Sequence, residues 1–221
     1  MNPEKEWKRI SPHNHTAAYS GCSEISPLNL IAGSAQAGLH GLIVTEHNHL
    51  WDSEELSQLK QRAVREKLCP PDFLLFAGRE VTATAGGKTA HALVFGYNGN
   101  IPVGMDLTAL CNYVHDRNGV IVLAHPCRNS GRQIERFWEY PADGAEFYSQ
   151  NQQNPVMKQL TARYRPNFAL FGSDDVHKEE HIGHFITLFP YWVRTEEDLV
   201  EAIRLRSVRP HEIGKKIYHI Q

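Results

Sequence analysis

Residues 41–47 read GLIVTEH, a short β-branched run that ends in an acid and an imidazole. Such runs are typical of buried strands, and the next segment, 52–68, has the caps and periodicity of a helix. The alternation continues along the chain. Apolar runs lie at 73–82, 90–97, 119–125, 143–148, 168–174 and 184–189, and further helix-like segments at 106–118 and 195–206. This order predicts an α/β fold with a mainly parallel sheet covered by helices.

The number of units favours a closed barrel. About seven β/α units in one chain fit a barrel better than an open doubly wound sheet. No GxGxxG follows the first strand, which weakens a dinucleotide-binding alternative. A chain of 221 residues without repeats or long linkers predicts a single domain over 1–221.

Composition narrows the class of protein. The chain is 41% hydrophobic and 22% charged, with a formal net charge of −2, which argues against a bulk nucleic-acid or anionic-membrane surface. The four cysteines are scattered without a CxxC pair, as in reduced intracellular proteins. No apolar run approaches a membrane span, and the first residues lack a signal-peptide core. We therefore expect a cytoplasmic protein.

Polar residues gather at the carboxyl ends of the apolar runs. In a parallel barrel these ends form one rim, where the catalytic groups of such folds are found. We expect the following residues to converge there: His13, His15, Glu46, His47, Glu80, His125, Glu146, Asp174, Asp175 and His177.

The spacing of these residues indicates a metal site. His13 and His15 alternate, as do Asp175 and His177, so each pair can point to one face of an extended segment. Zinc, manganese and iron accept imidazole together with carboxylate, and a bridging acid suits two cations. One HxH pair alone is more often a surface feature. Repetition of the pattern at successive strand ends favours metal binding.

Five stretches resemble the motifs of one family. HNHT (13–16), TEHN (45–48), GREVT (78–82), AHP (124–126) and SDDVH (173–177) are similar, in order, to those of the polymerase and histidinol phosphatase (PHP) family. Its members are metal-dependent phosphoesterases with a distorted (β/α)7 barrel. The resemblance runs from about residue 9 to residue 206 and implies that fold for the core of this chain.

The resemblance also implies a set of metal ligands for two or three divalent ions (zinc, manganese or iron). One ion would take His13, His15, Glu80 and Asp175. Glu80 would bridge to a second ion held by His91 and His125. A third ion, where present, would take His47 and His177.

The chain departs from the family pattern near this third site. Ser11 stands where members usually have an aspartate. YSGCS (19–23) replaces the usual third-site ligand, with Ser20 at about its position, which leaves Cys22 or Glu24 as substitutes.

Two further assignments stay open in the sequence. The DxH spacing selects Asp175 as the ligand, with Asp174 as a supporting residue. The asparagine that members often carry after the sixth strand corresponds to Ser149 or Asn151.

We expect a hydrolase that cleaves a small phosphorylated metabolite or nucleotide with metal-activated water. If the third ion is absent, His47 or His177 would protonate the leaving oxygen. Arg128 and Arg132 would clamp the phosphate with paired donors, unless they are ordinary loop arginines. The expected partner is a small-molecule phosphoester, with no membrane contact, and the sequence leaves the oligomeric state open.

Other functions remain possible on the same ligands. The chain can be a metal-dependent hydrolase of another ester or amide bond, or a catalytically inactive metal-binding module. A nuclease is less favoured because no basic stripe with interleaved aromatic residues is visible.

Overall fold

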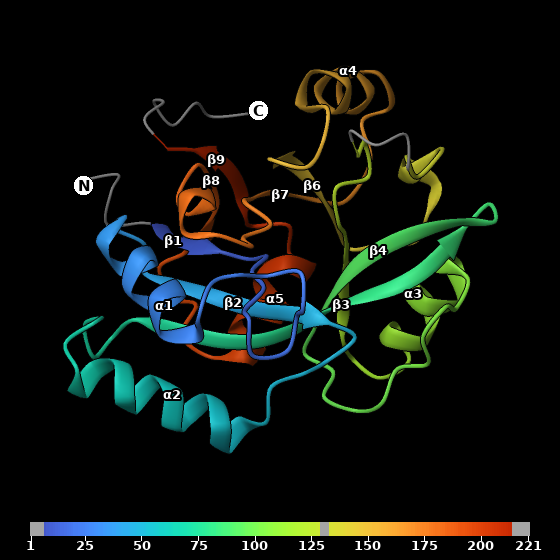
Figure 1. Ribbon diagram of the computed structural model, residues 1–221. Helices are drawn as coiled ribbons and strands as arrows, with labels where there is room; N and C mark the ends of the chain where they lie inside the picture. The colour runs from blue at the N-terminus through green and yellow to red at the C-terminus, as the bar shows by residue number, and fades with distance from the viewer. Residues whose placement is uncertain (1–6, 129–132, 214–221) are drawn as a thin grey trace.

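In the computed structural model, which describes residues 7–128 and 133–213, nine strands pair into one curled sheet (Figure 1). The strands are β1 (Trp7–Ser11), β2 (Gly41–His47), β3 (Leu74–Ala85), β4 (Lys88–Phe95), β5 (Val120–Leu123), β6 (Gly144–Ser149), β7 (Ala169–Ser173), β8 (Phe185–Pro190) and β9 (Arg209–Glu212). Their order in the sheet is β7-β6-β5-β4-β3-β2-β1-β8-β9.

The sheet is more mixed than the sequence analysis predicted. β1–β2–β3 and β5–β6–β7 pair in parallel, but β4 runs antiparallel to both of its neighbours. β8 and β9 also join by antiparallel pairs. The reason for the reversal at β4 is a hairpin, since β3 continues to Ala85 and turns at Gly86 and Gly87, both with positive φ. Glycine adopts that backbone without steric cost.

The two ends of the sheet meet through Gly172. β7 contacts β8 and β9, and a Cβ at Gly172 would lie 2.4 Å from the carbonyl oxygen of Ile186. The Thr187 hydroxyl donates to the Gly172 carbonyl at 2.9 Å and accepts from its N–H at 3.1 Å. The result is a nearly closed barrel, so the expected distorted α/β barrel is confirmed.

Helices cover the barrel and fill one end. The α-helices are α1 (Pro27–Gln36), α2 (Ser53–Arg65), α3 (Leu107–His115), α4 (Asn154–Tyr164) and α5 (Glu196–Arg204). Leu199 and Ile203 of α5 share a core with Ile10, Ile43 and Phe171 of the strands. Because this core lies toward the amino ends of the parallel strands, the carboxyl ends stay available for the polar residues. Among the described residues, no helix has the length and apolar character to cross a membrane.

Candidate metal centre

The structure gathers all eight predicted ligands at the carboxyl end of the barrel. His13 and His15 follow β1, His47 ends β2, Glu80 and His91 lie within β3 and β4, and His125 follows β5. Asp175 and His177 follow β7. In the described part of the chain, the ligand atoms of seven of them, all but Asp175, form three compact groups, in each of which the atoms lie within 4.8 Å of one another. The groups are His13–His15–Glu80, Glu80–His91–His125 and His15–His47–His177.

Glu80 joins two of these groups through different oxygens. Its Oε1 lies 2.8 Å from His91 Nδ1 and 3.1 Å from His125 Nε2. Its Oε2 lies 2.8 Å from His47 Nδ1 and 3.3 Å from His15 Nε2. Glu80 is 1% exposed. A carboxylate placed in this way can serve two cations at once.

Asp175 also faces both sides of the cluster. Its Oδ1 lies 3.2 Å from the Nε2 atoms of both His13 and His15, and its Oδ2 lies 3.7 Å from His125 Nε2. The Asn151 amide donates to Oδ2 at 2.6 Å. Asp175 has φ +52° and His125 has φ +31°, and such strained backbone is common at functional sites.

The donor set suits a divalent cation. Glu80 Oε2 and Asp175 Oδ1 are buried, and no group in residues 7–128 and 133–213 gives either oxygen a well-aligned hydrogen bond. The Nε2 atoms of His13 and His15 face each other at 2.9 Å in the same buried space. Buried acceptors without donors are costly, and a cation would satisfy them together. Imidazole with carboxylate suits zinc, manganese or iron.

Charge inside the cluster favours a positive occupant. Burial by itself lowers the pKa of His13, but the charges of Asp175, Glu146 and Glu80 outweigh it, and the pKa lies well above its usual value. Burial raises the pKa of Glu80, yet the His13 charge and imidazole hydrogen bonds hold that pKa well below the ordinary range. The carboxylates therefore stay ionised and attract positive charge, whether proton or metal.

Two buried glutamates lie behind the cluster, and one of them, Glu146, contacts an imidazole directly. Glu146 Oε1 lies 2.6 Å from His13 Nδ1 and accepts from the Ser173 hydroxyl, while its Oε2 accepts from the His125 N–H at 2.8 Å. Glu46 accepts from the Thr16 N–H and from Trp51 Nε1. The sequence placed both glutamates on the rim, but their contacts with ligand-bearing segments appear only in the structure. Carboxylates behind metal-binding histidines fix ring orientation.

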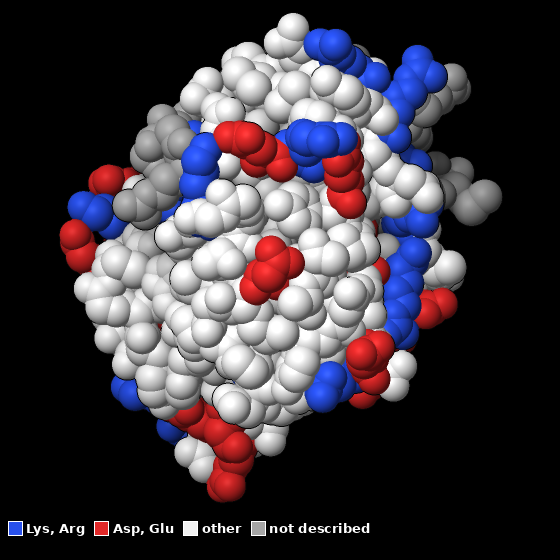
Figure 2. All heavy atoms as spheres, turned by 90° about the vertical axis from the view of Figure 1, so that its right-hand side faces the viewer, with Lys and Arg blue, Asp and Glu red and all other residues white. Residues whose placement is uncertain are grey.

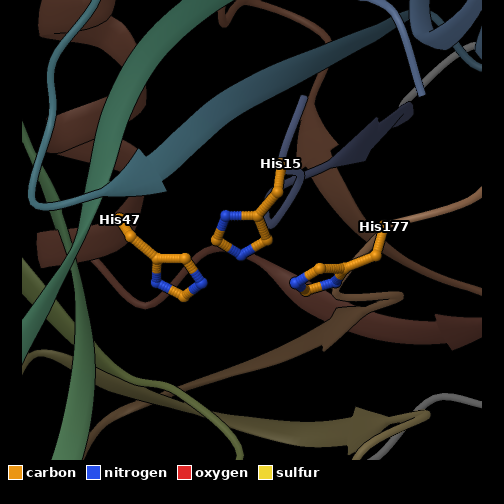
Figure 3. Close-up of side chains that lie close together, drawn as sticks. All are labelled: His15, His47 and His177. Carbon is orange, nitrogen blue, oxygen red and sulfur yellow. The ribbon is translucent and has the colours of Figure 1, made fainter. Parts of the chain in front are cut away.

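The third ligand group, His15–His47–His177, takes His15 as its third member and not one of the two substitutes that the sequence left open. His15 lies between His47 and His177 in Figure 3, with ring centroids 4.3 and 4.5 Å away. Neither Cys22 nor Glu24 belongs to a ligand group in the described chain, and Glu24 pairs with Lys178 at 3.1 Å.

The structure separates the two adjacent aspartates. Asp174 accepts from the backbone N–H groups of Gly183, His184 and Phe185 at 2.6–3.1 Å, away from the imidazoles. Asp175 alone of the two faces the cluster. The chain therefore uses Asp174 to hold the segment before β8. Of the two alternatives for the asparagine, Asn151 reaches Asp175, whereas Ser149 accepts a hydrogen bond from the Asn151 N–H.

Arg128 lies beside the cluster. It lines a small hollow with Thr89, His91, His125 and Ile134. Arg132, the other predicted phosphate ligand, lies outside the described residues.

Comparison with solved structures places this barrel among PHP-like folds. A two-domain protein from Bacteroides vulgatus that contains a predicted PHP-like metal-dependent phosphoesterase superposes with a TM-score of 0.69 at 18% identity. The match covers 93% of this chain and 65% of that one, so this chain spans less than two thirds of its length. At these identities the likeness shows the fold, and the fold that the motifs implied is confirmed.

Two other neighbours show how varied the proteins with this fold are. An amidohydrolase from Chromobacterium violaceum with bound sulfate and no metal matches at TM-score 0.58 and 15% identity, over 79% of this chain and 90% of that one. A lesion-specific endonuclease from Pyrococcus furiosus matches at TM-score 0.59 and 12% identity, over 90% of this chain and 56% of that one. No family model matches the chain, and no curated protein matches it in sequence.

Proposed function

We propose that this protein is a metal-dependent hydrolase that cleaves a small phosphoester. The observation that carries the proposal is the position of Glu80, whose two buried oxygens face two different groups of imidazoles. The fold shared with PHP-like phosphoesterases supports the same class of chemistry.

His13, His15, Glu80 and Asp175 would hold one ion, and Glu80, His91 and His125 would hold another. Bound divalent ions supply Lewis acidity, which activates water and neutralises charge on phosphoryl oxygens. The chain's own residues would orient the ester. Arg128 would take a phosphate oxygen from the hollow beside His91 and His125, since a guanidinium matches phosphate with paired donors.

Proton transfer would fall to His47 or His177. Burial lowers the pKa of His177 below its usual value although Asp175 opposes this, so its ring is neutral at pH 7 and suited to accept a proton. The His47 side chain is 32% exposed and its Nδ1 lies 2.8 Å from Glu80 Oε2. Because its side chain is more exposed than that of His177, which is 18% exposed, His47 is our first candidate for the group that protonates the leaving oxygen.

A small substrate fits the surface better than a nucleic acid does. On the side of the molecule that carries α3, Figure 2 shows a centre nearly free of Lys and Arg, with basic residues at its edges beside acidic ones. The formal net charge is −2. A continuous basic track, which nucleic-acid binding needs, does not cross the centre of this face.

The test is a substrate panel on protein loaded with manganese or zinc. We expect inorganic phosphate to be released from at least one class of small phosphomonoester or phosphodiester, and His47→Ala to lower kcat while the metal content is retained. Amide or carboxylic ester cleavage without phosphate release would favour the chemistry named for the amidohydrolase neighbour. A metal-loaded protein that cleaves no phosphoester, no amide and no carboxylic ester would refute a hydrolase role for this site.

A further inference from the structure

A serine links His15 to a buried glutamate. Ser20 is 2% exposed, and its hydroxyl oxygen lies 2.5 Å from Glu46 Oε2 and 3.3 Å from His15 Nδ1. The backbone N–H of His47 approaches the same oxygen at 3.3 Å. Glu46 is fully buried, and it also accepts from Thr16 and Trp51.

These contacts determine where the protons lie. A hydroxyl has one hydrogen and two lone pairs, and the short contact to a carboxylate takes the hydrogen. The serine oxygen can then only accept from its other two neighbours. The His15 Nδ1 must therefore carry a proton, which leaves the lone pair of the neutral ring on Nε2.

The same reasoning applies to two more rings. Glu146 lies behind His13 Nδ1 at 2.6 Å, and the carbonyl oxygen of Asp175 lies 2.9 Å from His177 Nδ1. Both partners are acceptors, so these rings also carry a proton on Nδ1 and leave Nε2 as the nitrogen that can bind a cation. His13 Nε2 and His15 Nε2 are 2.9 Å apart, close enough to bind one cation together once it displaces the proton between them.

We infer that Glu46 and Ser20 act as a positioning pair that commits His15 to the His13–His15–Glu80 group, so that the chain holds two ions rather than three. His15 belongs to two of the three ligand groups but has a single free nitrogen, and one lone pair binds one cation. Without His15, the third group keeps only His47 and His177. This inference depends on the metal centre of the proposed function, and it makes His47 and His177 available for proton transfer.

The first measurements need no substrate. Nitrogen-15 NMR of the histidine side chains in zinc-loaded protein should show His15 with its proton on Nδ1. Metal analysis of protein saturated with manganese or zinc should give two ions per chain. A third ion per chain, or a His15 ring with its proton on Nε2, would overturn the inference.

Two variants test the pair itself. Ser20→Ala removes the acceptor behind His15, and we expect 10- to 100-fold weaker binding of one ion, as is usual when such a supporting contact is lost. Glu46→Gln, which removes the carboxylate, should act in the same direction and serves if Ser20→Ala does not fold. Unchanged affinity in both variants would refute the role.

Ser23→Ala is the matched control. Its hydroxyl lies in the same loop, 3.0 Å from the carbonyl oxygen of His15 and 3.2 Å from that of His177, and touches no ring nitrogen in the described chain. We expect the wild-type tautomer and affinity, and an equal loss of affinity here would refute the role of Ser20. Two bound ions without hydrolysis of any phosphoester would defeat the proposed function but leave this inference standing.

Discussion

At the scale of single residues, Glu80 has the most demanding position in the molecule. It is buried, ionised and within 3.3 Å of four imidazole nitrogens, two on each carboxylate oxygen. Glu80→Gln keeps the shape but removes the charge and one acceptor oxygen. Loss of a residue that supports a ligand typically weakens metal binding 10- to 100-fold. Glu80 is itself a proposed ligand, so we expect both ions to bind at least about 100-fold more weakly. Titration with a chelating metal indicator measures this.

Glu55→Gln is a suitable control for Glu80→Gln. Glu55 accepts from the Tyr19 hydroxyl at 2.7 Å and belongs to no ligand group in the described chain. Its variant should bind metal as the wild type does. Normal stoichiometry and affinity in Glu80→Gln would show that Glu80 does not bridge.

The adjacent aspartates give a second prediction at this scale. Asp174→Asn weakens the acceptors for the N–H groups of Gly183, His184 and Phe185, and we expect about 1–3 kcal/mol of lost stability with the metal content unchanged. Asp175→Asn should instead lose metal. Urea denaturation and metal analysis of both variants decide the matter. Loss of metal in Asp174→Asn alone would reverse our assignment of the two roles.

Sequence spacing could predict which side chains reach the rim, but not how they face one another. The positions of His13, His15 and Asp175 follow from alternation along extended segments. The contact between His13 and Glu146 joins residues 133 positions apart, and its 2.6 Å distance depends on how the two strands pack. The Ser20–Glu46 contact likewise requires a loop conformation that no local pattern specifies. The ligand roles themselves remain predictions.

At the scale of elements, the β3–β4 hairpin is where the sheet departs from the mainly parallel arrangement that the sequence predicts. Two adjacent glycines between apolar runs are a hairpin signal. The antiparallel register matters for the site, because it pairs Thr82 with His91 and Glu80 with Leu93. Reversal of β4 thus brings His91 beside Glu80 on the neighbouring strand.

Barrel closure at β7 depends on the absence of a side chain at Gly172. A methyl group there would meet the Ile186 carbonyl at 2.4 Å, and backbone cannot move aside as a flexible side chain can. We expect Gly172→Ala to cost about 1–3 kcal/mol, the usual effect of overpacking. Gly21→Ala, whose Cβ would meet nothing within 4 Å, should be nearly neutral. Equal stability of the two variants in urea denaturation would contradict this role of Gly172.

His40 connects β1, β2 and β3, and we expect it to make the stability of the fold depend on pH. Its Nδ1 accepts from the Arg9 N–H at 3.0 Å, and its carbonyl accepts from the Leu74 N–H. Burial lowers the pKa of His40, and the charges of Arg9 and Lys8 lower it further. As the pH falls below about 6.5, the unfolded chain takes up this proton before the folded one does. The contribution is therefore complete above that pH and is lost below it.

His40→Asn tests this contribution, because an amide oxygen can replace Nδ1 as the acceptor but does not titrate. We expect the free energy of unfolding of His40→Asn to fall less steeply between pH 7 and pH 5 than that of the wild type. Urea denaturation at several pH values measures the two slopes. Parallel slopes would show that His40 does not contribute to the pH dependence.

At the scale of the whole molecule, the barrel concentrates six imidazoles and two carboxylates from six segments in one buried place. α5 fills the opposite end, so the polar cluster sits on an apolar core that resists rearrangement. The alternation of runs along the chain predicted this overall layout. It could not predict that β8 and β9 would complete the sheet through antiparallel pairs.

A cluster of this kind should make the stability of the entire fold depend on metal. Without a cation, Glu80 Oε2 and Asp175 Oδ1 are buried acceptors that lack well-aligned donors in the described chain. A ligand present at about 1,000 times its Kd stabilises the folded state by about 4 kcal/mol. For a domain of this size each kcal/mol moves the Tm by about 2–4 °C, so chelation should lower the Tm by roughly 10 °C.

Differential scanning calorimetry with and without a chelator measures the shift, and Glu80→Gln should show little of it. A wild-type Tm that stays constant while metal analysis shows complete removal would mean that these residues do not hold the ions, because any cation bound among them must stabilise the fold that brings them together.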